Sequence, residues 1–195
     1  MQMISQRTVD ALKHDSEQSH EVFSKAHAQY SEAEEELARA AGVRSNLVRN
    51  LDIGRKALSD AMQKAVQAAI ANAGFEEAAA EVLALDNEVR LRDVALRRYH
   101  AFQYADTQRA TLAARVLMLE LQHSAEKARL AAHVAEIEVG LSAVAMKNGG
   151  VLEVQTGGAT RGHEELIARI GRDAEEAREA LRNHDAETLE LRGKL

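Results

Sequence analysis

The sequence predicts an all-α fold of three to four long helices, which form an elongated coiled-coil-like antiparallel bundle or rod with one Gly-rich loop. Proline, which breaks helices and is common in the turns of mixed folds, is absent from all 195 residues. Aromatic residues make up only 3% of the chain, so the apolar content is mainly Ala, Leu and Val, which fill narrow helix–helix contacts rather than a thick core. Apolar or small residues also recur in alternating steps of three and four, the heptad spacing of packed helices.

Residues 1–74 are expected to form a helical hairpin. The first helix would end at Gly42, and the second would end at the sequence "NAG" of residues 72–74, because Asn and Gly tolerate the left-handed conformation that ends helices. Gly54 is expected to kink the second helix. The inward positions predicted for the first helix are Leu12, Ser16, Ser19, Phe23, Ala26, Tyr30, Ala33, Leu37 and Ala40. Those predicted for the second helix are Leu47, Leu51, Leu58, Met62, Val66 and Ile70.

Residues 75–146 contain one Gly and no Pro, and are expected to form a long central helix. If continuous, this helix would measure roughly 110 Å at about 1.5 Å per residue. The heptad pattern is lost in "QYADTQRAT", residues 103–111. A hinge or a change of helix partner is therefore predicted there.

Residues 147–162 are expected to be a Gly-rich loop, and residues 163–195 a C-terminal helix. Two Gly-Gly pairs flank "VLEVQT", a possible short strand. Its apolar residues Val151, Leu152 and Val154 are candidates for pairing with the strand edge of a partner, and a plain connector is the alternative. The loop is not a phosphate-binding motif, since His163 and Glu164 stand where Lys and Ser or Thr are needed. The inward positions predicted for the last helix are Ile167, Ile170, Ala174, Ala177, Leu181, His184, Thr188 and Leu191.

A second candidate contact surface lies on the central helix, where arginines alternate with aromatic residues. Arg97, Arg98, Tyr99 and Phe102 are the candidate partner-contact residues. A face from Arg90 to Arg115 with interleaved aromatics could also contact nucleic acid. Acidic residues dilute it, and half of these charges are expected to form i,i+4 pairs. The net charge of −6 argues against a general nucleic-acid binder.

Two Glu-x-x-His pairs raise a metal-binding alternative. Glu17 with His20 and Glu120 with His123 have the spacing with which ferritin-like bundles hold metal ions. The number of such pairs is close to chance for this composition. His123 falls on an inward position that Glu120 could share, whereas Glu17 and His20 turn towards the flank. We therefore predict no metal site and keep a ferritin-like protein as the alternative.

The sequence as a whole predicts a non-enzymatic structural or interaction protein. It would be a coiled-coil component of a larger, homo-oligomeric assembly, such as a phage virion or a bacterial secretion apparatus, with itself and other proteins as partners. No catalytic residue or cofactor is predicted, and the absence of Cys excludes disulfides and thiolate metal sites. The N-terminal residues lack the apolar stretch of a signal peptide, and no stretch is apolar over 18 residues, as a membrane span requires. The expected location is the cytoplasm or an assembled virion or export apparatus.

Overall fold

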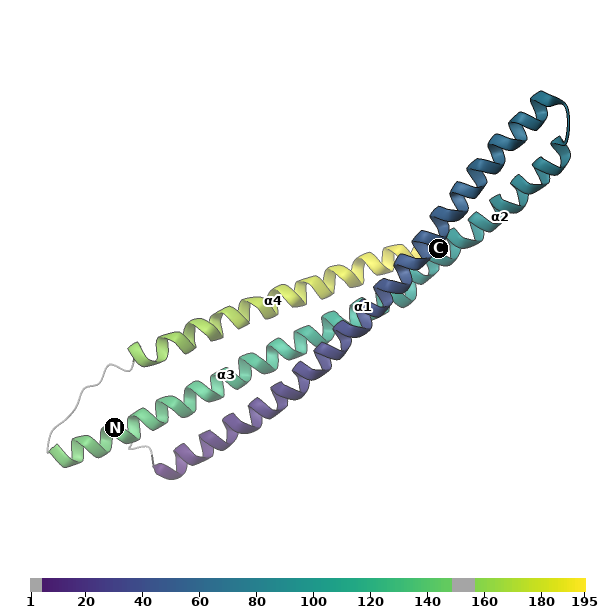
Figure 1. The fold of residues 1–195 in the computed structure, drawn as a ribbon. Helices are drawn as coiled ribbons and strands as arrows, with labels where there is room; N and C mark the ends of the chain where they lie inside the picture. Colours follow the sequence, from purple (N-terminus) through teal and green to yellow (C-terminus); the bar gives the residue numbers. More distant parts are fainter. Residues whose placement is uncertain (1–4, 149–156) are drawn as a thin grey trace. The chain divides into compact units, whose positions relative to one another are not determined.

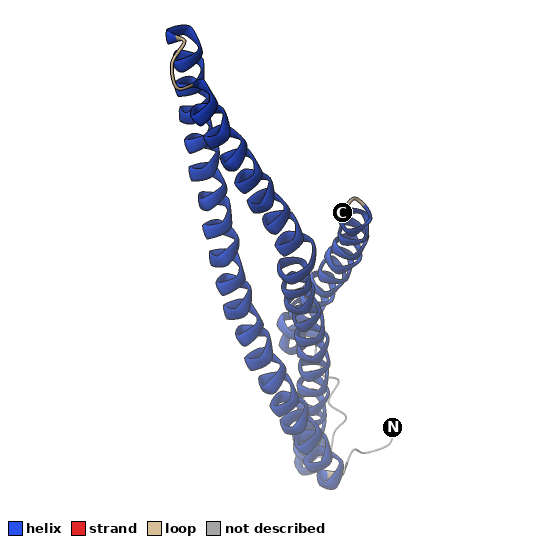
Figure 2. Cartoon of the chain, turned by 90° about the vertical axis from the view of Figure 1, so that its right-hand side faces the viewer, coloured by secondary structure: helices blue, strands red, loops and turns tan. Residues whose placement is uncertain are grey.

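The protein is almost entirely helical, as predicted. The computed structural model describes residues 5–148 and 157–195, and this part of the chain contains no strand (Figures 1 and 2). A π-helical turn, η1, joins the second and third helices without a break. The elements are α1 (Gln6–Ala71), α2 (Phe75–Tyr99), η1 (His100–Tyr104), α3 (Ala105–Asn148) and α4 (Gly157–Gly193).

Residues 1–74 do not form a hairpin, because α1 continues through Gly42. A Gly inside a helix costs only about 0.5–1 kcal/mol relative to Ala, and the residues around it are good helix formers. The predicted stop at residues 72–74 is correct. Asn72 and Gly74 have φ values of 53° and 69°, and these left-handed residues turn the chain from α1 into α2.

Part of the segment predicted as a loop, residues 147–162, is helical. Its first two residues belong to α3, and its last six, from Gly157 onward, are the first turns of α4. Gly is well tolerated at the start of a helix. The glycines of this segment therefore do not prevent α4 from beginning at Gly157. Val151, Leu152 and Val154 lie outside the described residues.

The chain divides into two compact units, and both contain parts of α1, α3 and α4. Unit 1 comprises Met1–Ala33 and Ala110–Asn183. Unit 2 comprises Glu34–Arg109 and His184–Leu195. Neither unit is a continuous stretch of sequence, so long-range helix contacts hold each one together.

In unit 1, α1 and α3 run in opposite directions. The Thr111 hydroxyl donates a hydrogen bond of 3.1 Å to the Ala33 carbonyl. At the other end, the Lys13 ammonium lies 2.5 Å from a carboxylate oxygen of Glu136. The inward positions predicted for this part of α1 are all buried or half-buried, so the heptad pattern identified the packed face.

The core of unit 1 lies between α3 and α4. Leu119 of α3 packs with Ile170, Ala174 and Ala177 of α4, and all four are less than 8% exposed. The three α4 residues are among the predicted inward positions. Two of the four are Ala, which contributes little apolar area but lets the helices approach closely.

In unit 2, the second part of α1 runs antiparallel to α2. The Tyr99 hydroxyl donates to the Ala40 carbonyl at 3.0 Å, and the Arg92 guanidinium donates to the Asn50 carbonyl at 2.6 Å. Gly54 is buried at this contact, and a Cβ there would come within 2.9 Å of Arg92 Nη1. Gly54 therefore lets the two helices approach.

The predicted register change coincides with the π turn. The π turn occupies His100–Tyr104 and overlaps the start of the predicted stretch, residues 103–111. A π turn inserts an extra residue and rotates the following residues around the helix axis. It also exposes the Ala101 carbonyl to a second donor, and Arg192 of α4 donates Nε–H to it at 2.8 Å. The same guanidinium pairs with Asp106.

Candidate interaction surface

The end of the α1–α2 hairpin carries an open apolar groove of about 750 Å³. All of its lining residues are apolar and come from the last turns of α1 and the first turns of α2. Five of its six large side chains are 51–82% exposed, and the sixth, Val82, is half-buried. We call this surface the tip groove, defined by Met62, Val66, Ile70, Phe75 and Leu83.

The tip groove corrects one sequence prediction. Met62, Val66 and Ile70 were expected to face inward, but they are 53%, 59% and 82% exposed. Alanines on the adjacent stripe of α1 pack against α2 instead, with Ala61 only 2% exposed. Small side chains allow the two helices to approach more closely than large ones would. The alanines therefore form the face of α1 that contacts α2.

A second heptad pattern in the sequence could have revealed this arrangement. Gly54, Ala61, Ala65 and Ala68 follow one another in steps of seven, four and three, and all four are buried or half-buried. The stripe of larger residues has the same spacing. Spacing alone therefore does not decide which stripe packs inward; the size of the side chains does.

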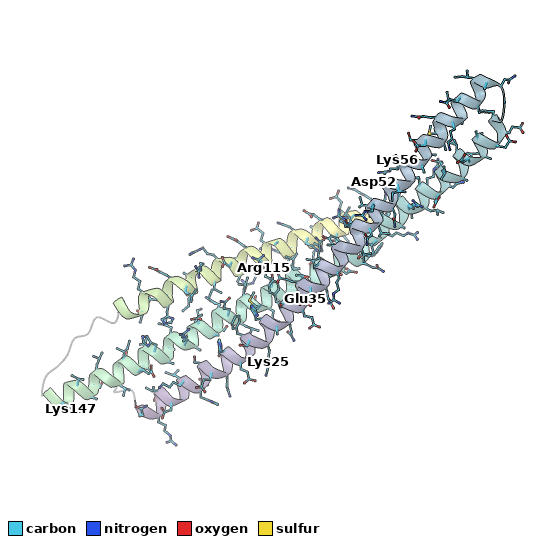
Figure 3. All side chains as sticks on the ribbon, in the orientation of Figure 1. Lys25, Glu35, Asp52, Lys56, Arg115 and Lys147 are labelled. Carbon is cyan, nitrogen blue, oxygen red and sulfur yellow. The ribbon has the colours of Figure 1, made fainter. Side chains whose placement is uncertain are left out.

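Five charged residues in this part of the hairpin have no partner within the described chain. Lys56 and Lys64 lie on α1 (Lys56 is labelled in Figure 3), and Glu76, Glu77 and Glu81 lie on α2. None of the five forms an ion pair or hydrogen bond with another residue of the described chain. At 3.6 residues per turn, Lys64, Glu77 and Glu81 lie on the face of the hairpin opposite the tip groove.

The predicted contact residues Arg97 and Arg98 lie on the exposed side of α2. Arg97 forms an i,i+4 ion pair of 2.7 Å with Asp93, and Arg98 is exposed. Half of the six arginines of the Arg90–Arg115 face make such pairs along the helix, as expected. The pairs are Arg90 with Asp86, Arg92 with Glu88 and Arg97 with Asp93.

Intramolecular contacts engage the two aromatic contact candidates. Tyr99 is half-buried and donates its hydroxyl proton to the Ala40 carbonyl. The Phe102 ring lies 5.0 Å from the Arg192 guanidinium carbon, a cation–π contact. Phe102 is still 44% exposed, so only this ring retains a substantial free surface.

The structure does not bring the two Glu-x-x-His pairs together as a metal site. Glu17 and His20 are exposed on α1, whereas Glu120 accepts hydrogen bonds from Arg178 of α4 at 2.6 and 2.9 Å. Within residues 5–148 and 157–195, no three His, Asp or Glu side chains are grouped to hold a metal ion. The Glu120 carboxylate is therefore engaged in an ion pair with Arg178.

His123 packs against α4. A Cβ at Gly171 would lie 3.6 Å from His123 Nε2, so Gly171 leaves room for the imidazole. Burial, followed by the charges of Lys127 and Arg178, lowers the pKa of His123 below its usual value. His123 is thus a polar residue at a helix contact.

Comparison with protein-family models, curated proteins and solved structures found no match to this chain. None of the described helices has a stretch long and apolar enough to cross a membrane. The tip groove is an exposed apolar surface within the described residues.

Proposed function

We propose that this protein is a non-enzymatic structural or interaction protein, a helical component of a larger, homo-oligomeric assembly. One observation carries the proposal: many large apolar side chains are exposed, and most of the fully buried apolar residues are alanines. Of the 13 buried apolar residues in the described chain, 9 are Ala, whereas 17 large hydrophobic residues are exposed. An isolated protein would gain from the reverse arrangement, so the outer surfaces are suited to other chains.

The energy available at the tip groove supports this proposal. The five large side chains that define it are on average about three-fifths exposed. Full burial of one such side chain contributes about 1.5–3 kcal/mol. A partner that covers all five would therefore gain about 6 kcal/mol before the cost of association is subtracted.

The proposed setting is an assembly built largely from helices, such as a phage virion or a bacterial secretion apparatus. The proposed partners are copies of the chain and other proteins of that assembly. Long helices with few breaks suit such structures, although this is an analogy of architecture.

The mass of the full chain in solution tests this proposal. Light scattering over a range of concentrations should give a particle heavier than the 21.3 kDa chain, and the mass should fall on dilution. Chemical cross-linking followed by mass spectrometry would identify the contacting peptides. A mass of one chain at every concentration, together with no complex in an extract of the native host, would contradict the proposal.

A further inference from the structure

We propose that the tip groove binds the tip groove of a second copy of this chain. The two α1–α2 hairpin ends would pair about a twofold axis and form a four-helix bundle. The inference rests on the proposed function and names the partner and the surface for it.

The tip groove has the shape that a twofold contact requires. In such a contact the same patch lies on both sides, so it must be complementary to itself. Large side chains stand on both edges of the groove, and the alanines Ala65, Ala69 and Ala79 lie between them. Large residues of one copy can therefore pack over the alanines of the other, as knobs pack into holes between helices.

The size of the groove is sufficient for a specific contact. The five large side chains that define it expose on the order of 500 Å² per copy. Two copies together would bury about 1,000 Å² from these residues alone, which is near the lower limit for a specific protein interface. A second copy that covers these side chains therefore reaches that limit.

A matched pair of substitutions on α1 tests the inference in the full chain. Val66→Glu places a charge in the groove, and Val22→Glu makes the same change at a residue of unit 1 that is 47% exposed. Sedimentation equilibrium should show self-association weakened at least about tenfold by Val66→Glu and unchanged by Val22→Glu. Both positions are exposed, so circular dichroism should show both variants as helical as the wild type.

A substitution on the other helix gives a second, independent measurement. Leu83→Glu on α2 should weaken self-association as Val66→Glu does. Leu91→Glu, at a residue of α2 that is 71% exposed outside the groove, should not.

Each outcome decides between the inference and the proposed function. Loss of the dimer in Val66→Glu and Leu83→Glu, with the dimer retained in Val22→Glu and Leu91→Glu, supports both. A dimer that persists in Val66→Glu overturns the inference and leaves assembly through another surface. A wild-type monomer whose groove binds a different protein, or neutral lipid vesicles, overturns the inference as well. A monomer that binds no protein overturns both.

Discussion

Two glycines of α1 should respond in opposite ways to the same substitution. Gly42 and Gly54 both lie inside α1, where Gly→Ala lowers the conformational entropy of the unfolded chain and stabilises a helix by about 0.5–1 kcal/mol. A Cβ at position 42 meets nothing within 4 Å. We therefore expect Gly42→Ala to stabilise the protein by that amount.

At position 54 the added methyl group meets α2. Its Cβ would lie 2.9 Å from Arg92 Nη1 and 3.3 Å from Val89 Cγ2. Arg92 must move, and it then loses its hydrogen bond to the Asn50 carbonyl. A hydrogen bond of a charged group contributes about 1.5–3 kcal/mol, and the lower end applies because the Arg92 side chain is 34% exposed. Gly54→Ala should therefore destabilise the protein by about 0.5–1 kcal/mol, and the two variants should differ by about 1.5–2 kcal/mol.

Urea unfolding followed by circular dichroism measures this difference. All variants must be compared at one protein concentration, because self-association stabilises the folded state. A double-mutant cycle with Arg92→Ala isolates the contact. In that background Gly54→Ala should no longer destabilise, since the group it displaces is gone.

Equal stabilisation by Gly42→Ala and Gly54→Ala would refute this reasoning. It would mean that α2 does not pack against α1 at Gly54. Destabilisation by Gly42→Ala would refute a different step, the continuity of α1 through the predicted break.

Three further predictions concern other parts of the two units. Ile170→Ala should cost about 2–5 kcal/mol in urea unfolding, because it leaves a cavity in the core of unit 1. Arg192→Ala should cost about 1–3 kcal/mol, because the Ala101 carbonyl loses its side-chain donor; Arg192→Lys, which cannot reproduce the planar guanidinium, should recover only part of this. Burial, together with the charge of Arg44, lowers the pKa of His100. The folded chain then binds fewer protons than the unfolded one, so its stability should fall as the pH drops below the ordinary His value of 6.5, and His100→Phe should make that fall smaller.

The sequence predicted the helical fold and the packed face of the first part of α1. That face contains Leu12, Phe23 and Leu37 together with smaller residues, and no competing stripe with the same spacing lies beside it. In the second part of α1 two such stripes are present. The predicted inward face followed the stripe of Met62 and Val66. Close approach of α2 at Gly54 and the alanines decided the packing instead.

The π turn shows a different limit of sequence reasoning. The loss of heptad spacing near residue 103 indicated that something changes there, but several irregularities produce the same signal. The turn is held by a donor that lies 91 residues further along the chain, the Arg192 guanidinium on the Ala101 carbonyl. A local pattern contains no information about such a contact. The hydrogen-bond partner could be found only once α4 had been placed.

The packing of α2 on α1 bears on the proposed dimer, because both involve the end of the α1–α2 hairpin. α2 contains no buried residue, so its contact with α1 removes little apolar area from water. A helix of this kind gains most of its stability from tertiary packing of its apolar face. Leu85, Val89 and Leu96 of α2 are half-buried and supply part of that packing, whereas Phe75 and Leu83 are 51% and 66% exposed at the tip groove. A second copy that covers them would complete the core of the hairpin, so folding of its tip and association would be parts of one equilibrium.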